Sequence, residues 1–261
     1  AKNKPEDYQH FWQQFGSVMK EGLGEDFSNR ETIAGLMRFA STHNDDQTQN
    51  VSLDDYISRM TEGQDKIYYI TAESFETAKN SPHLEVFRKK GIEVLLLSDR
   101  IDEWAISHLT DFKEKKLVSV TQGDLDLGNL EDEKEKQERE QVEKDNQPLA
   151  ERFKEVLAER VKEVKVTTRL TDSPACVVSS EGEMSAQMAR LMASAGQEAP
   201  EVKPVFEFNP EHPLVKRAAE QSGDDFNDWT LFLFDQAMLA ESGSLKDPGT
   251  FTRRLNALLL K

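Results

Sequence analysis

Cysteine is almost missing from this 261-residue chain, because Cys176 stands alone. A single cysteine excludes an internal disulfide, which agrees with a reducing compartment. Long apolar runs are missing too. The longest span residues 94–97 and 231–234, far short of the roughly 20 residues that a membrane-spanning helix needs. Residues 1–5 have no apolar segment of the kind found in secretory signals, so we expect an intracellular protein.

Positive charge is scarce relative to negative charge. The chain has 33 Lys and Arg against 49 Asp and Glu, a formal net charge of −16. Nucleic acids and anionic membranes both require a basic face, so we expect neither as a partner. With 37% hydrophobic and 31% charged residues, the chain has material for two modest cores under a strongly solvated surface. High net charge also favours solubility in a protein that binds aggregation-prone partners.

The first half of the chain has the pattern of a small parallel sheet. Three apolar runs with strand composition occupy residues 66–71, 92–97 and 117–120. Helical patterns separate them, one ending at Lys90 and one over residues 101–109, as in right-handed crossover connections. Upstream, the pattern predicts helices over residues 8–19, after a capping box at 28–31, and from residue 52 onward.

A charged stretch follows at residues 131–145, in which Val142 is the single apolar residue. It is typical of a solvated helix or a flexible linker. We therefore predict three parts: residues 1–122, a charged linker over residues 123–147, and a second domain over residues 148–261.

The second domain has a mixed pattern, with a helix that opens at Pro148. We expect strands over residues 164–169, 175–178 and 205–208, and helices over residues 183–195, 211–221, 225–241 and 248–260. The fold class is therefore α/β and α+β. It comprises N-terminal helices, a small α/β/α three-layer module with a parallel sheet, and a mixed α+β domain ending in helices.

Motifs for catalysis are largely missing. The turn at residues 71–74 has no glycine to admit a phosphate and contains an acidic residue, which disfavours a nucleotide site. The five histidines are scattered without metal-ligand spacing, so we expect no metal site. Asp99, Asp102 and Glu103 form a carboxylate cluster after a strand. Helix capping explains them most simply, and a small-molecule enzyme on the sheet is the alternative.

Two apolar patterns are candidates for protein-binding surfaces. Met184, Met188, Leu191 and Met192 fall on one face of a predicted helix, which is either a core stripe or an exposed, adaptable binding face. The last two predicted helices have broad apolar faces, which favour a helix-bundle dimer or packing within the domain. Those faces comprise Phe226, Trp229, Phe232, Leu233 and Ala237 in one helix and Phe251, Leu255, Leu258 and Leu259 in the other.

Several segments resemble a known family. Residues 67–71 (Ile-Tyr-Tyr-Ile-Thr), 87–97 and 101–104 (Ile-Asp-Glu-Trp) closely resemble the middle domain of the heat-shock protein 90 chaperones. Residues 169–175 (Arg-Leu-Thr-Asp-Ser-Pro-Ala) resemble the C-terminal domain of that family. Residues 253–256 (Arg-Arg-Leu-Asn) look like the bacterial members. The resemblance covers essentially the whole chain except the charged linker.

The resemblance implies a part of an ATP-dependent chaperone from the bacterial cytoplasm. It places residues 1–122 in the C-terminal part of the middle domain and residues 148–261 in the C-terminal dimerisation domain. The family's ATP-binding domain has no match here, so we expect no cofactor and no active site in this chain, and ATP with magnesium in a longer parent protein. A start without Met agrees with a chain taken from something longer. Expected partners are non-native client proteins, a second copy and other bacterial chaperones.

The resemblance also implies which residues bind. Client contacts would be Trp104, Ser107, Met184, Met188, Leu191 and Met192. Two of these depart from the family pattern, because relatives have Asn at position 107 and an aromatic residue at position 192. The terminal helices would form the family's dimerising four-helix bundle. The competing functions are a dimeric scaffold without client binding and the small-molecule enzyme.

Overall fold

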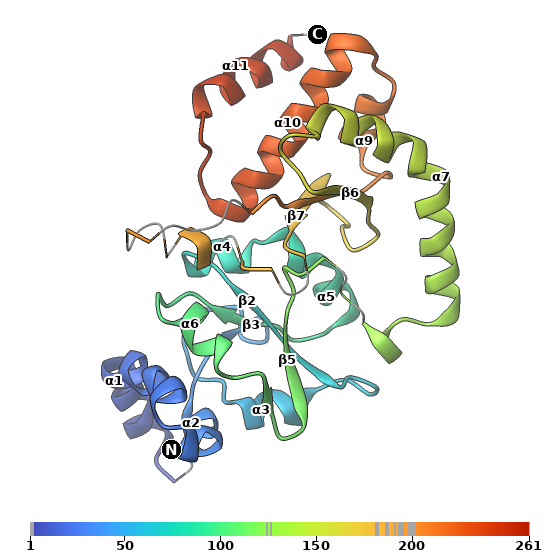
Figure 1. The fold of residues 1–261 in the computed structure, drawn as a ribbon. Helices are drawn as coiled ribbons and strands as arrows, with labels where there is room; N and C mark the ends of the chain where they lie inside the picture. Colours follow the sequence, from blue (N-terminus) through green and yellow to red (C-terminus); the bar gives the residue numbers. More distant parts are fainter. Residues whose placement is uncertain are drawn as a thin grey trace. The chain divides into compact units, whose positions relative to one another are not determined.

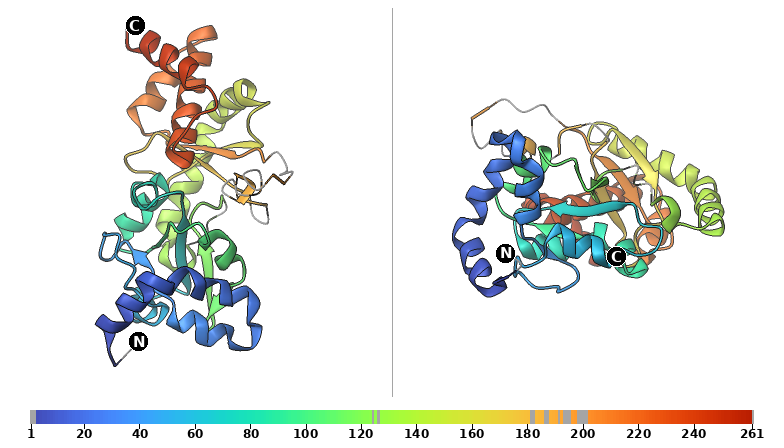
Figure 2. Two further views of the ribbon diagram at one scale, coloured as in Figure 1. Left: turned by 90° about the vertical axis from the view of Figure 1, so that its left-hand side faces the viewer. Right: turned by 90° about the horizontal axis from the view of Figure 1, so that it is seen from below.

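The computed structural model describes residues 3–123, 125, 127–180, 183–185, 188–190, 192, 196–197 and 202–260 (Figures 1 and 2). The chain divides by its contacts into two compact units. Unit 1 comprises Ala1–Asn80 and Phe87–Val120, and unit 2 comprises Ser81–Val86 and Thr121–Lys261. The α/β and α+β fold class predicted from the sequence is confirmed.

The sheet of unit 1 has a parallel centre and antiparallel edges. Its strand order is β1-β3-β2-β5-β4, and β2 pairs in parallel with both β3 and β5. The strands are β1 (Ala40–Ser41), β2 (Lys66–Thr71), β3 (Leu95–Leu97), β4 (Asp111–Phe112) and β5 (Lys115–Ser119). The three central strands were predicted. The two antiparallel edge strands were not, because two residues are too few to show a strand period.

Three helices precede the first strand: α1 (Pro5–Glu25), η1 (Phe27–Asn29) and α2 (Arg30–Leu36). Short helices connect the later strands, namely α3 (Leu53–Arg59) before β2, α4 (Phe75–Lys79), η2 (Pro82–Leu84) and α5 (Glu85–Lys90) before β3, and α6 (Asp102–Ser107) before β4. One continuous helix ending at Lys90 was expected between β2 and β3, and this was wrong, although α5 does end at Lys90. Helix α4 ends at Lys79 with Asn80 as its C-cap, and Ser81 caps a separate 3-10 turn that Pro82 opens.

The capping box expected at residues 28–31 is also wrong. Asp26 accepts a hydrogen bond from the Asn29 amide at 3.2 Å and so caps a 3-10 turn. Ser28 lies inside that turn, and α2 begins at Arg30 without a side-chain cap. The Asp26 carboxylate and the Ser28 hydroxyl can each accept a hydrogen bond from a backbone amide. Both residues are therefore candidate N-caps in the sequence.

Unit 2 is a three-stranded sheet covered by helices. Its order is β6-β8-β7, with β6 parallel and β7 antiparallel to β8. The strands are β6 (Glu163–Val166), β7 (Ala175–Val178) and β8 (Val205–Phe208). The helices that the structure describes here are η3 (Gly128–Leu130), α7 (Glu133–Leu157), α9 (Pro213–Ala219), α10 (Gly223–Ser242) and α11 (Pro248–Leu259). In Figure 1, α10 and α11 (orange and red) pack side by side.

Phe153 lies at the centre of the core of unit 2. Its ring contacts those of Phe208 and Phe226 at centroid distances of 4.9 and 5.4 Å, and that of Phe206 at 6.1 Å. Burial of such rings contributes much of a domain's stability. One aromatic cluster therefore joins α7, β8 and α10.

Helix α7 runs without a break through the charged stretch and into the core of unit 2. It begins at Asp132, whose side chain forms a capping box with Glu135, and Pro148 lies inside it. The expectation that a helix opens at Pro148 was wrong, because the loss of one backbone hydrogen bond is outweighed by the packing on both sides. Phe153 and Leu157 are both fully buried and anchor its C-terminal half. Within the described ranges, no helix has the length and apolarity to cross a membrane.

Candidate functional site

The Trp104 indole lies in a slot between α1 and the end of its own helix, α6. It is half-buried. Its six-membered ring rests on the backbone of α1 at Gly24. The His108 ring lies next to the indole, at a centroid distance of 4.5 Å, and also borders Gly24. The indole is therefore partly covered by α1 and by the end of α6.

Backbone contacts hold this end of α6 in place. The Ser107 hydroxyl donates to the Trp104 carbonyl at 2.6 Å, and His108 Nδ1 lies 2.9 Å from the same oxygen. Ser107 is exposed. The two residues predicted on this surface, Trp104 and Ser107, thus lie together at one helix end.

A buried lysine joins α1 to the start of α6. Lys20 is 1% exposed, and its ammonium lies 2.7 Å from Asp99 Oδ2 and 2.5 Å from Asp102 Oδ1. It also lies 5.9 Å from the ring centroids of both Trp12 and Phe39, within cation–π range. No pattern in the sequence distinguishes this lysine from its exposed neighbours.

The same ion pairs account for the carboxylate cluster. Burial raises the pKa of Asp102, with the nearby Lys20 charge acting against it. Burial also acts to raise the pKa of Asp99, but the charge and hydrogen bond of Lys20 and a hydrogen bond from Gln49 outweigh it, so that pKa is lowered. Asp102 Oδ2 accepts the Asp99 amide at 2.8 Å, but α6 begins after Ile101 without a side-chain cap. The expectation that this cluster caps the helix was therefore wrong, although Asp102 and Glu103 do lie in its first turn, where the helix dipole favours acidic residues. Asp99 and Asp102 serve instead as the partners of Lys20.

The methionine segment is described in part. Met184, Met188 and Met192 are half-buried, and Leu191 lies outside the described residues. Residues 184 and 185 are not helical, while 188–190 and 192 are. Ser185 accepts the Met188 amide at 3.0 Å through its hydroxyl. The expected helix start at residue 183 was therefore too early, and Met184 precedes the helix instead of lying on its face.

Most of the apolar residues of the terminal helices are buried by this chain itself. Those in the core of unit 2 are Phe226, Trp229, Phe232, Leu233, Ala237 and Leu258. Phe251 and Leu255 are half-buried against that core, and Phe251 stacks on Phe232 at 5.8 Å. The intradomain alternative therefore explains much of this apolar character.

A smaller set remains exposed near the end of α11. Leu259 is 75% exposed, Leu260 is 89% exposed, and Leu239 in α10 is also exposed. Asp235 of α10 accepts hydrogen bonds from Arg254 of α11 and from Arg160 in the turn after α7, each at 2.9 Å. The hydrogen bond from Arg254 ties α10 to α11, the two helices that carry these leucines or lead into them.

One exposed apolar strip was missed from the sequence. Phe11, Phe15 and Val18 are exposed on α1, and the rings of Phe11 and Phe15 stack at 5.2 Å. Trp12, on another face of the same helix, is buried. The helical spacing of apolar residues in α1 was recognised from the sequence. That spacing alone cannot show which of the two apolar faces of α1 packs on the rest of unit 1.

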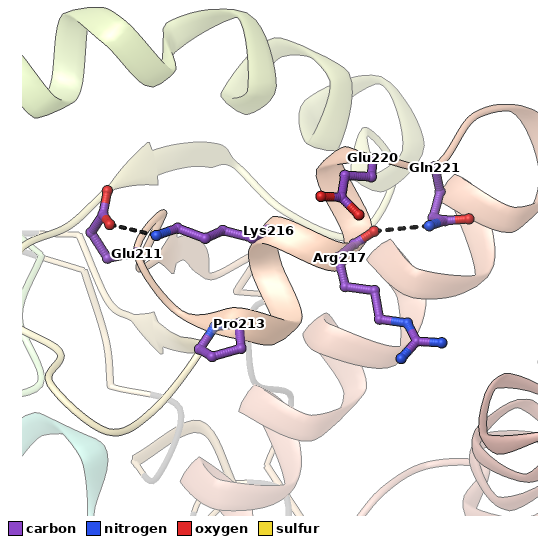
Figure 3. Close-up of a pocket in the computed structure, with 6 residues that line it drawn as sticks. All are labelled: Glu211, Pro213, Lys216, Arg217, Glu220 and Gln221. Carbon is purple, nitrogen blue, oxygen red and sulfur yellow. Dashed lines mark hydrogen bonds and ion pairs between the residues drawn. The ribbon is translucent and has the colours of Figure 1, made fainter.

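A shallow recess of about 580 Å³ lies along α9 (Figure 3). Lys216 donates to Glu211 at 2.6 Å, while the Arg217 guanidinium points away from Glu220 and lies over the Trp229 ring, 5.6 Å from its centroid. The Gln221 amide donates to the Arg217 carbonyl at 3.1 Å. Side chains of both charge signs give this recess no marked preference for one class of ligand.

Comparison with known proteins decides the family. The whole chain, residues 1–261, matches the family model described as Hsp90 protein. The chain belongs to the Hsp90 family. Three similar relatives are named chaperone protein HtpG: those of Colwellia psychrerythraea and Pseudoalteromonas translucida, each 61% identical, and that of Nitrosococcus oceani, 60% identical. The matches cover 99–100% of this chain.

The Hsp90 chain described here is shorter than these relatives. It spans 40–41% of their length. Its resemblance to the Hsp90 chaperones, first noted from short segments such as residues 101–104, is thus confirmed over the full sequence. The roles of individual residues in client binding and dimerisation remain predictions.

Proposed function

We propose that this chain is the client-binding and homodimerising portion of an ATP-dependent molecular chaperone of the bacterial cytoplasm, which assists the folding of non-native proteins. The observation that carries the proposal is the match of the entire chain to the Hsp90 family, with bacterial relatives named HtpG. Other bacterial chaperones are further expected partners. The high negative charge suits a protein that must stay soluble while it holds apolar surfaces.

Two half-buried apolar sites support the client-binding role. Trp104 is half-buried beside exposed Ser107 in unit 1, and Met184, Met188 and Met192 are partly accessible in unit 2. Thioether and indole side chains suit varied partners, since methionine repacks readily and tryptophan combines a large apolar area with a polar edge. Such sites favour non-native segments over one defined ligand.

The residues of this chain do not fit a nucleotide site at the end of β2. The Ala72 amide is already used, because it donates to the Leu97 carbonyl at 3.0 Å. The Ser74 hydroxyl accepts the Thr77 amide and caps α4. Glu73 adds a negative charge at the same turn. We therefore assign ATP and magnesium to another part of the longer protein, and propose no active site in this chain.

Replacing Met184 and Met188 together by aspartate is expected to weaken client binding about tenfold. Each carboxylate would have to be desolvated against an apolar client segment. The measurement is the affinity for reduced and carboxymethylated lactalbumin, a permanently unfolded polypeptide, together with suppression of aggregation of a heated client.

The matched control is the double leucine variant, Met184→Leu with Met188→Leu, which keeps the apolar surface and should bind nearly as well as the parent. Thermal unfolding of all three proteins separates binding from folding. If the aspartate variant unfolds, these methionines belong to the core and the client site is misassigned. Equal affinity of folded parent and aspartate variant would favour a dimeric scaffold without client binding.

A further inference from the structure

The Trp104 indole can lie against α1 only because residue 24 has no side chain. A Cβ added at Gly24 would fall 2.5 Å from Cη2 and 2.6 Å from Cζ2 of Trp104. Carbon atoms in contact prefer separations of about 3.5–4.0 Å, so a methyl group and the indole cannot share this space. The same Cβ would lie 3.3 Å from His108 Cδ2.

The helices on either side of this contact are tied together. Lys20, one turn before Gly24 in α1, pairs with Asp102, two residues before Trp104 in α6. A buried ion pair of this kind resists separation, because moving the helices apart would leave charges unpaired away from water. A side chain at position 24 would therefore displace the indole rather than the helix.

The indole can yield only by turning away from α1. The His108 ring lies beside the indole and borders Gly24 as well, because the added Cβ would meet both rings, and the Trp104 carbonyl is held by Ser107 and His108. With the backbone fixed, the indole rotates about its side-chain torsions away from α1. The exposed apolar area of Trp104 would increase.

We propose that Gly24 is a positioning residue for Trp104, and that the size of residue 24 sets how much indole surface this chain offers to an apolar client segment. The inference rests on the proposed client-binding role of Trp104. In the native protein, the missing side chain at Gly24 lets the indole pack against α1. Less of the indole is then available to a client segment, and the contact between Trp104 and the client stays weak. A weak contact suits a partner that must later be released.

Gly24→Ala tests this proposal in the 261-residue chain. Acrylamide quenching of tryptophan fluorescence should rise, and the change reports on Trp104 because Trp12 and Trp229 are only 2% and 7% exposed. Affinity for carboxymethylated lactalbumin should increase about threefold, the gain expected from roughly 25–30 Å² of additional apolar contact. The matched control is Gly35→Ala in α2, where the new Cβ would meet Phe112 Cζ at an ordinary 3.9 Å.

A double-mutant cycle separates the positioning of Trp104 by residue 24 from the client-binding role of Trp104. In a Trp104→Ala background, Gly24→Ala should change neither quenching nor affinity. If quenching rises in the single variant but Trp104→Ala leaves client affinity unchanged, positioning holds and the client role of Trp104 fails. Unchanged quenching in Gly24→Ala, or loss of its fold, shows that the indole does not yield and overturns the inference.

Discussion

Lys20→Met is expected to destabilise unit 1 by about 3–5 kcal/mol, the cost of breaking a buried ion pair by removing one partner. Methionine keeps the packing of the stem between Trp12 and Phe39 but leaves Asp102 buried without its cation. Asp99, which is about one third exposed, can turn to water and contributes less. Urea unfolding followed by tryptophan fluorescence measures the effect.

Two further variants make this test specific. Lys4→Met changes an exposed lysine in the same part of the chain, paired with Asp7 at 3.4 Å, and should cost less than about 0.5 kcal/mol. Adding Asp102→Asn to Lys20→Met removes the orphaned charge while keeping an oxygen for the Asp99 amide, and should recover most of the loss. A Lys20→Met protein as stable as the parent would show that the ion pair contributes nothing to unit 1.

Leu259→Asp is expected to raise the dimer dissociation constant at least about 100-fold. In the proposed bundle, α10 and α11 of one copy pack on those of a second copy, so each substitution acts twice across a symmetric interface. Burying two unpaired carboxylates costs several kcal/mol, and each 1.4 kcal/mol is tenfold in affinity. Sedimentation velocity over a concentration series gives the dissociation constant.

The fold should survive this change, because Leu259 is 75% exposed within one chain. Asn256→Asp is the matched control, since it adds the same charge at an exposed position one turn earlier in α11. It should leave the dimer intact. A parent protein that sediments as a monomer at micromolar concentration would count against the bundle, and an undiminished dimer of Leu259→Asp would place the interface elsewhere.

Long and regular patterns in the sequence were sufficient to predict the main elements. The apolar runs in β2 and β3 were recognisable because a buried parallel strand is apolar along most of its length, and β5 was recognisable from its apolar pair Leu117 and Val118. Helices α10 and α11 were predicted within two residues at each end, since Gly243 and Pro248 mark a stop and a start. Elements specified by few residues, such as β1 and β4, were missed.

Capping and helix continuity depended on competition between neighbours. Asp26 and Ser28 were both suitable caps, and the chain used Asp26. Pro148 was a plausible first residue of a helix, yet α7 continues through it. In each case two local choices differ by about 1–3 kcal/mol, which tertiary packing easily overrides.

The amino-acid sequence by itself determined the fold class, the family and the residue types available for binding, because these depend on patterns repeated along many positions. Which apolar residues remain accessible was decided only by the tertiary structure. Phe232 and Leu259 look alike in a helical pattern, yet one is buried in unit 2 and the other is exposed. Lys20 and Gly24 acquire their roles only because α6 folds onto the same face of α1, and contacts between distant segments have no local signature.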